Sequence, residues 1–151
     1  MEKIIIYTDG ACSGNQNSEN IGGYGAVLMY KDNKKEIYGG EINTTNNRME
    51  LKACIEALKM LKRNDIPIDV HTDSAYLCNC INQEWYKKWR SNGWKNSKKE
   101  PVENKELWVE LLDLVERFRN IKFIKVKGHS GVEYNELADA LANKGMKDIG
   151  N

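Results

Sequence analysis

Four acidic residues occupy positions beside apolar patterns, where a charged side chain is unusual: Asp9, Glu50, Asp73 and Asp139. Asp9 and Asp73 each end an apolar run that is typical of a strand. Glu50 begins an apolar helical stripe, and Asp139 is the only charge within residues 137–142. Carboxylates that point toward a core are costly unless something compensates their charge. Divalent cations such as Mg²⁺ and Mn²⁺ take oxygen ligands, so the pattern predicts a metal-dependent enzyme.

The two aspartates that follow strands are expected to lie together. In open α/β sheets, ligands gather outside the carboxyl ends of the strands. If the two strands are parallel neighbours, the carboxylates of Asp9 and Asp73 raise each other's pKa unless a cation intervenes. Two cations would explain four carboxylates, and metal pairs about 3.5–4 Å apart stabilise in-line displacement at phosphorus. The predicted reaction is therefore phosphodiester hydrolysis.

The two histidines and the acidic residues also have simpler interpretations. His129 lies in the glycine-flanked segment 128–131 and could move a proton or aid product release, although taken alone it is a plain loop residue. His71 is interpreted as a satisfied strand residue. The chain has 22 acidic residues, so each of the four carboxylates, taken singly, could be a helix-dipole partner or a turn cap.

The composition predicts one globular domain over residues 1–151. The chain is 40% hydrophobic and 30% charged, and its length fits a single core. A charged pair follows Met1, and no apolar run is long enough to cross a membrane, so we expect a cytoplasmic protein with no membrane partner. The four cysteines lack zinc-site spacing and are expected to be reduced thiols. We also expect a monomer.

The charge is distributed unevenly along the chain. Residues 87–99 contain six lysines and arginines and no acidic residue. Because the whole chain has a formal net charge of +1, the remainder carries −5. A basic patch and an acidic cluster are therefore expected on one small body.

Hydrophobic periodicity and turn residues predict nine elements. Asn46 or Asn47 is expected to cap the first helix, and Ser74 the second. The order of the elements implies antiparallel strands first and crossovers later, hence an α/β fold with a mixed sheet flanked by helices. The expected strands cover residues 3–8, 24–30, 35–42, 68–72 and 121–126, and the helices cover about 46–62, 74–81 and beyond, 103–119 and 134–147.

Seven ordered phrases of the sequence resemble the type 1 ribonucleases H of bacteria, over essentially the full chain. Three of them contain the phrases Tyr-Thr-Asp-Gly, Thr-Thr-Asn-Asn-Arg-Met-Glu and Lys-Gly-His-Ser-Gly. The matching segments are residues 7–12, 22–26, 44–51, 72–74, 89–95, 126–131 and 135–139.

The resemblance implies a ribonuclease H-like fold, in which a five-stranded mixed β-sheet is flanked by α-helices and carries a basic protrusion. It implies an endonuclease that cleaves the RNA strand of an RNA–DNA hybrid with two Mg²⁺ ions, or with Mn²⁺, and leaves 5′-phosphate and 3′-hydroxyl ends. Asp9, Glu50, Asp73 and Asp139 fall on the family's four metal ligands. His129 falls on its loop histidine, which assists turnover.

Substrate contacts are implied by the same resemblance. An enzyme that cuts only RNA must sense the 2′-hydroxyl, which lies in a wide and shallow minor groove. Asn15, Asn46 and Asn47 match family positions that contact the hybrid, and Thr45 matches one that holds a DNA-strand phosphate. Asn46 and Asn47 could instead serve only as helix caps.

The segment from Trp85 to Lys99 resembles the family's basic protrusion, which grips the DNA strand. Lys88, Arg90 and Lys95 would attract phosphates, and Trp85 and Trp89 would pack against sugars and bases. Taken alone, a run of charge is usually a solvated face.

Two features depart from the family pattern. Residues 16–21 form a longer polar loop than the short turn of many relatives, which bears on the placement of Asn15. Ala75 stands where a glutamine often contacts the minor groove, so one substrate contact is expected to be missing.

Two other functions compete with the ribonuclease. A non-catalytic module that binds hybrids or double-stranded RNA would share the basic segment but would not need four inward carboxylates. A nuclease of the same fold that cuts DNA usually lacks the phrase at residues 44–50 or belongs to a longer chain.

Overall fold

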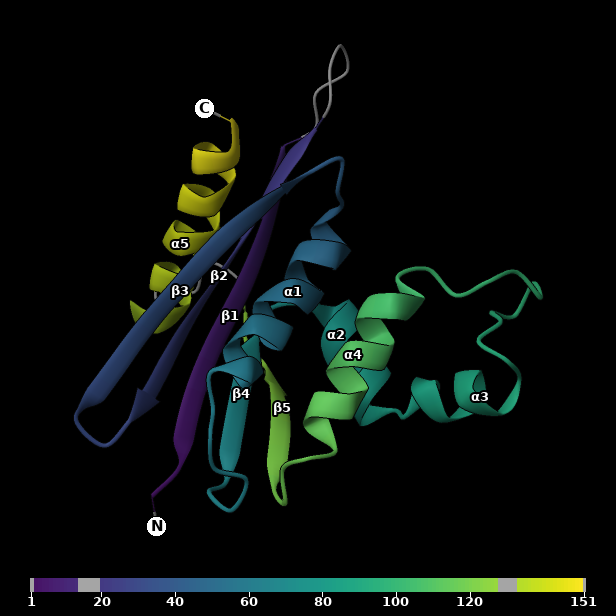
Figure 1. The fold of residues 1–151 in the computed structure, drawn as a ribbon, viewed down its shortest axis with the longest axis horizontal. Helices are drawn as coiled ribbons and strands as arrows, with labels where there is room; N and C mark the ends of the chain where they lie inside the picture. Colours follow the sequence, from purple (N-terminus) through teal and green to yellow (C-terminus); the bar gives the residue numbers. More distant parts are fainter. Residues whose placement is uncertain (1, 14–19, 128–132, 151) are drawn as a thin grey trace.

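One mixed sheet organises the molecule (Figure 1). The computed structural model describes residues 2–13, 20–127 and 133–150. The strands lie in the order β3-β2-β1-β4-β5, which agrees with the predicted fold class. They are β1 (Ile4–Ser13), β2 (Ile21–Tyr30), β3 (Asn33–Ile42), β4 (Ile68–Thr72) and β5 (Ile121–Lys125). The helices are α1 (Asn46–Lys59), α2 (Ala75–Asn82), α3 (Trp85–Ser91), α4 (Lys105–Val115) and α5 (Glu133–Gly150).

Strand β1 is the centre of the sheet and pairs differently on its two sides. It runs antiparallel to β2 and parallel to β4. The parallel ladder ends at the pair Thr8 and Thr72, so Asp9 and Asp73 each lie one residue beyond it, as predicted. The prediction that β1 itself ends at Thr8 was wrong, because residues 9–13 stay paired with β2.

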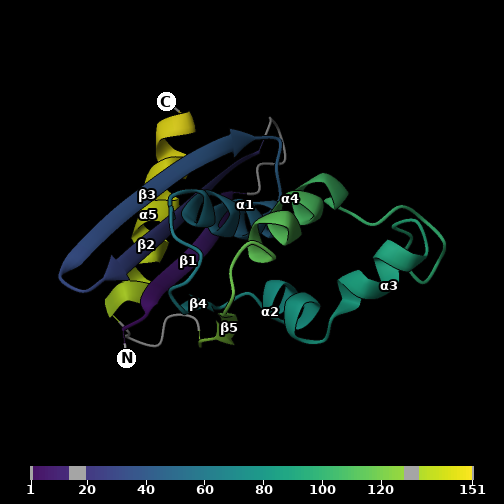
Figure 2. The same ribbon diagram turned by 60° about the horizontal axis from the view of Figure 1, so that its bottom comes forward.

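Helices cover both faces of the sheet (Figure 2). Side chains alternate between the two faces along a strand. Ile4 and Ile6 of β1 belong to the core that includes α1, whereas Tyr7 packs with Val27 and Leu141 in the cluster formed with α5. As a result, α1 and α5 approach the end of the parallel ladder from opposite faces.

The approach of α5 depends on a residue without a side chain. Gly25 is the register partner of Asp9. A Cβ atom on Gly25 would lie 2.6 Å from both the backbone nitrogen of Ala142 and the Cβ of Leu141. Real Cβ atoms do not reach such distances, so glycine lets α5 lie directly over the strand beside Asp9.

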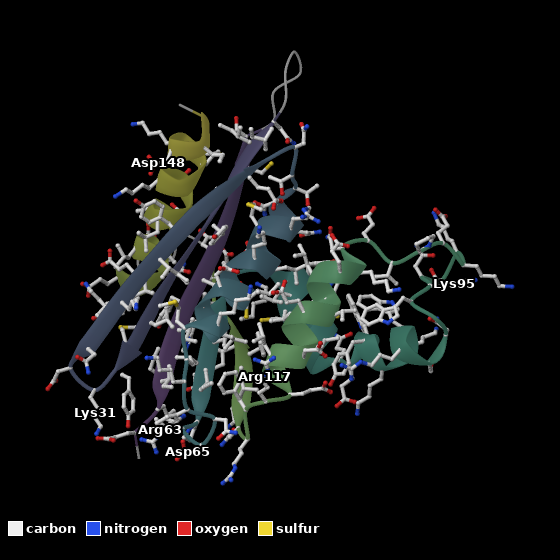
Figure 3. The ribbon with its side chains drawn as sticks, in the orientation of Figure 1. Lys31, Arg63, Asp65, Lys95, Arg117 and Asp148 are labelled. Carbon is white, nitrogen blue, oxygen red and sulfur yellow. The ribbon has the colours of Figure 1, made fainter. Side chains whose placement is uncertain are left out.

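Helix α3 was missing from the predicted elements. The sequence pattern suggested one helix continuing past Ile81, but α2 ends at Asn82 and Glu84 takes a left-handed conformation with φ 59°. A left-handed residue breaks a right-handed helix. The chain then forms α3, and residues 85–104 project away from the sheet in both ribbon views. Figure 3 places Lys95 on this projection.

The predicted helix boundaries needed small corrections. Helix α1 ends at Lys59 rather than near residue 62, and α4 covers Lys105–Val115 rather than 103–119. Ser74 caps α2 as predicted, because its hydroxyl accepts a hydrogen bond from the backbone nitrogen of Leu77 at 3.1 Å. All four cysteines are free thiols. Within the described residues, the structure has no helix that combines the length and apolarity needed to span a membrane.

Candidate active site

Three carboxylates from three elements meet at the end of the parallel ladder. One oxygen each from Asp9, Glu50 and Asp73 lie within 4.8 Å of one another. Asp9 comes from β1, Glu50 from α1, and Asp73 from the turn after β4. Asp139 of α5 lines the same pocket, which has a volume of about 440 Å³. The structure therefore brings all four predicted carboxylates to one pocket.

Glycine at position 10 allows α1 to deliver Glu50. A Cβ atom on Gly10 would lie 2.7 Å from the backbone nitrogen of Glu50 and 2.9 Å from the Cβ of Met49. A larger residue at position 10 would push this part of α1 away from β1. In the Thr8-Asp9-Gly10 segment, Asp9 thus supplies one carboxylate of the pocket and Gly10 leaves the space that lets Glu50 supply another.

The electrostatic environment of Asp9 favours its neutral form when no cation is present. Burial of the side chain and the charge of Asp73 raise the pKa of Asp9 from 3.8 to about 8. A side-chain hydrogen bond with Asp139 contributes to this rise, and a hydrogen bond from the Gly10 backbone nitrogen partly opposes it. Adding positive charge to the pocket would restore the carboxylate.

Glu50 is the most deeply buried of the ligand-type residues, with 3% of its surface exposed. Burial raises its pKa well above 4.5, and the charges of Asp9 and Asp73 raise it further. Among the described residues, Oε1 of Glu50 has no hydrogen-bond partner. A buried carboxylate oxygen without a donor is unfavourable unless a cation or a proton compensates it. Asp9, Glu50 and Asp73 therefore form a cluster suited to a hard divalent cation.

The asparagines at the start of α1 do not cap the helix. Thr45 is the N-cap, and its hydroxyl accepts a hydrogen bond from the backbone nitrogen of Arg48 at 3.1 Å. The predicted capping by Asn46 or Asn47 was wrong, because the cap lies one residue earlier. Both asparagines instead belong to the first turn of α1 and line the acidic pocket.

Comparison with known proteins assigns the family. The RNase H family model matches residues 1–147. The chain belongs to the RNase H family. It is 53% identical over 149 residues to the Ribonuclease H of Clostridium botulinum (strain Hall), covering 99% of each chain. It is 54% identical over 147 residues to the Ribonuclease H of Acetivibrio thermocellus, covering 97% of each chain.

Two solved structures have a fold similar to that of this chain. The crystal structure of LC9-RNase H1, a type 1 RNase H with the type 2 active-site motif, superimposes with a TM-score of 0.85 at 30% identity. That match covers 97% of this chain and 73% of the other. A foamy viral protease-reverse transcriptase in complex with an RNA/DNA hybrid matches with a TM-score of 0.82 at 25% identity, over 97% of this chain and 20% of the viral one.

A second pocket in this RNase H family member lies on the projecting segment. Trp85, Lys88, Trp89 and Lys95 all line it, and its volume is about 490 Å³. Trp85 is 38% exposed, whereas Trp89 is partly buried against the core. The structure thus brings together four of the five residues that the resemblance assigned to the basic protrusion.

Arg90 is the exception among these residues. Its guanidinium makes two hydrogen bonds to the carboxylate of Glu116, at 2.9 and 3.0 Å, and lies over the ring of Tyr86. Arg90 therefore pairs with a residue at the end of α4 and does not line the pocket with Lys88. The sequence could not reveal this pairing, because the two partners are 26 residues apart.

His71 differs from its interpretation as a satisfied strand residue. Its ring stacks on Tyr7 of the neighbouring strand, with centroids 4.5 Å apart, and Tyr7 in turn lies 6.0 Å from the ring of Tyr134. Nδ1 of His71 is buried and has no hydrogen-bond partner among the described residues. The face of β4 that carries His71 therefore packs through aromatic contact.

Two predicted site residues, Asn15 and His129, lie outside the described residues. One pocket residue was not predicted at all. Tyr76 lines the acidic pocket, three positions after Asp73 in the first turn of α2. A signal was available, because the first turn of a helix that follows a strand-end aspartate must lie at the same edge of the sheet.

Proposed function

We propose that this protein is an endonuclease that hydrolyses the RNA strand of RNA–DNA hybrids with two Mg²⁺ ions, for which Mn²⁺ can substitute. The products would carry 5′-phosphate and 3′-hydroxyl ends. The observation that carries the proposal is the meeting of Asp9, Glu50 and Asp73 within 4.8 Å, in a chain that the RNase H family model matches over residues 1–147. The hybrid bound by the related viral protein supports the substrate class.

The residues of the acidic pocket fit hard cations. The pocket supplies carboxylate oxygens, and the buried Oε1 of Glu50 has no other partner among the described residues. In our proposal Asp9, Glu50, Asp73 and Asp139 hold the ions. When bound, such ions supply a water of lowered pKa and neutralise charge that develops on the phosphate. The carboxylates of the chain would position this charge in the pocket.

Recognition of the RNA strand is assigned to the start of α1. Asn46 and Asn47 line the acidic pocket, and their amides can both donate and accept hydrogen bonds. In the proposal they contact the 2′-hydroxyl side of the hybrid near the cut. Thr45 uses its oxygen as an acceptor in the helix cap, which leaves its O–H group to donate to a DNA-strand phosphate.

The DNA strand is assigned to the pocket on the projecting segment. Lys88 and Lys95 provide positive charge, and the exposed ring of Trp85 provides an apolar face beside them. These groups read the backbone and the sugars, so we expect weak sequence preference. The guanidinium of Arg90 is paired with Glu116, so in this proposal Arg90 is less available to phosphates than Lys88 and Lys95.

Three predictions from the sequence remain part of the proposal. Asn15 would contact the hybrid, and His129 would assist turnover. His129→Ala should slow turnover and leave measurable activity, and a completely inactive variant would assign the histidine a more central role. We also propose that residues 1–151 act as one monomeric catalytic domain in the cytoplasm, and the four free cysteines are compatible with that compartment. Light scattering of the purified protein tests the monomer.

The deciding experiment is cleavage of a labelled RNA–DNA hybrid with and without Mg²⁺. Matched RNA duplex, DNA duplex and single-stranded RNA are the controls. Metal-dependent cutting confined to the RNA of the hybrid is the expected result. Tight hybrid binding without cutting in Mg²⁺ or Mn²⁺ would contradict the proposal and favour a non-catalytic binding module.

A further inference from the structure

Three aromatic side chains connect the acidic pocket to the pocket on the projecting segment. Tyr76 lines the first pocket and Trp89 lines the second. Trp108 of α4 lies between them, with ring centroids 5.5 Å from Tyr76 and 5.9 Å from Trp89. The two pockets share no lining residue, so this aromatic contact is a direct packing link between them.

Helix α3 depends on this link for its position. None of its residues is fully buried, and it joins α2 through Glu84 in a left-handed conformation. Its partly buried Trp89 packs against Trp108 and against Trp94, whose ring centroid is 5.9 Å away. The pair of Arg90 with Glu116 is exposed, and exposed ion pairs fix geometry weakly. The ring of Trp108 is therefore the buried surface against which α3 packs.

The side chain of Trp108 is oriented by Tyr76, a residue that lines the acidic pocket. Its ring is fully buried, and its Nε1 donates a hydrogen bond to the hydroxyl oxygen of Tyr76 at 2.7 Å. A buried indole N–H needs a partner. Tyr76 lies three residues after Asp73, so the hydroxyl of one residue ties the indole to the segment that carries a candidate metal ligand.

We propose that the Tyr76 hydroxyl is a positioning group that sets the spacing between the two pockets. This inference rests on the proposed function. A hybrid whose DNA strand occupies the pocket of Trp85 and Lys88 would present a particular phosphate of its RNA strand to the carboxylates. The Tyr76–Trp108–Trp89 chain would then determine which phosphate is cut. Tyr76 acts through Trp108 and is not a catalytic residue.

The first test is Tyr76→Phe, which removes one oxygen and keeps the ring. The substrate is a hybrid just long enough to span both pockets, with an end-labelled RNA strand, so that few binding registers compete although sequence preference is weak. We expect the share of the dominant cut site to fall in favour of its neighbours, and KM to rise about threefold to tenfold. The dependence of binding on salt should stay unchanged, because no phosphate contact is removed.

The cut-site distribution distinguishes positioning from simple loss of stability. A partly unfolded enzyme would have fewer active molecules, yet each active molecule would cut at the same sites. Tyr38→Phe is the matched control, because it removes the same atom from an exposed tyrosine on β3. The control should keep the wild-type distribution and KM.

Trp108→Phe removes the donor of the same hydrogen bond and provides an independent variant. It should broaden the cut sites at least as much, because it also removes part of the ring that packs against Trp89. The double variant should be little worse than Trp108→Phe alone, because the hydrogen bond is already lost in that variant. A folded Tyr76→Phe or Trp108→Phe variant with the wild-type cut-site distribution would overturn the inference. Failure of the wild-type protein to cut the hybrid would instead overturn the proposed function.

Discussion

At the scale of single residues, Asp9 controls the charge of the site. Strand β1 places its carboxylate in the same pocket as Glu50 of α1 and Asp139 of α5. Burial and the charge of Asp73 raise the pKa of Asp9, so a negative charge on this side chain is unfavourable in the metal-free pocket. The same crowding that disfavours the carboxylate in the metal-free protein makes the pocket attractive to cations. Substitution at Asp9 should therefore separate metal binding from substrate binding.

Asp9→Asn should lower the turnover of the hybrid by roughly 1,000-fold, since loss of metal stabilisation is worth several kcal/mol. Hybrid binding without metal should persist, because Asp9 is already mostly neutral in the metal-free pocket and no phosphate contact is removed. Rates of cleavage and a binding titration measure the two effects. Asp69→Asn is the matched control, because Asp69 lies on β4 outside the acidic pocket and pairs with Lys3. Near-normal turnover of Asp9→Asn would refute the metal assignment.

Gly10→Ala should displace Glu50 through backbone contact alone. The new Cβ would lie 2.7 Å from the Glu50 nitrogen, so we expect a loss of about 1–3 kcal/mol in the free energy of unfolding. Turnover of the folded variant should fall as well, because a ligand is moved. Denaturant titration and kinetics at low temperature measure both quantities.

The control for Gly10→Ala is Gly40→Ala. Gly40 lies on β3 outside both pockets, and a Cβ there would lie 2.6 Å from the backbone oxygen of Gly145. This clash should cost about 1–3 kcal/mol in the free energy of unfolding, while turnover of the folded variant is kept. If both variants lost turnover equally, general destabilisation rather than displacement of Glu50 would be the cause.

At the scale of elements, α3 and the segment after it form the surface that can meet a nucleic acid. Trp85, Lys88 and Lys95 line one pocket, whereas Arg90 and Lys87 are occupied by Glu116 and Glu84. The six positive charges of residues 87–99 are therefore not equivalent. Lys88 and Lys95 have no acidic partner among the residues that the structure describes, so they are the lysines expected to attract phosphates.

Lys88→Ala combined with Lys95→Ala should weaken hybrid binding. The slope of log K against log salt should become shallower by about one to two, because one or two released counterions are lost. Binding titrations over a range of salt concentrations measure the slope. The pair Lys34→Ala and Lys35→Ala on β3 removes the same charge away from both pockets and should leave the slope nearly unchanged. Equal slopes for both double variants would contradict the assignment of the second pocket.

At the scale of the whole molecule, the acidic pocket links stability to pH and metal. Burial and the charge of Asp73 raise the pKa of Asp9 from 3.8 to about 8, and Glu50 is shifted in the same direction. Between pH 3.8 and about pH 8, Asp9 is protonated in the folded protein and ionised in the unfolded chain. The free energy of unfolding of the metal-free protein should therefore fall as pH rises through this range.

Urea unfolding in chelator at several pH values measures this dependence. Asp9→Asn should flatten the decline, because the titrating group is absent. Adding Mg²⁺ near pH 8 should stabilise the wild-type protein by about 2.7 kcal/mol at 100 times its dissociation constant. Stability that rises with pH above 5 in the metal-free wild type would show that other groups dominate.

Glu41 is not expected to contribute to the pH dependence of unfolding above pH 5. Burial opposes its ionisation, but hydrogen bonds from Arg48 and Lys52 lower its pKa to about 2.

The sequence by itself determined which residues could perform the chemistry and which segments are strands. Asp9 and Asp73 end apolar runs and Glu50 begins an apolar helical stripe, and such strand and helix patterns are local properties of the chain. Such features are readable because neighbouring residues in the chain produce them.

Only the tertiary structure decided how these segments meet. It assigned the cap of α1 to Thr45, broke the second helix at Glu84, and paired Arg90 with Glu116. It also brought Asp139 to the pocket from the face opposite to Glu50. These outcomes depend on contacts between residues far apart in the chain, whose free energies are decided by packing and register rather than by local preference.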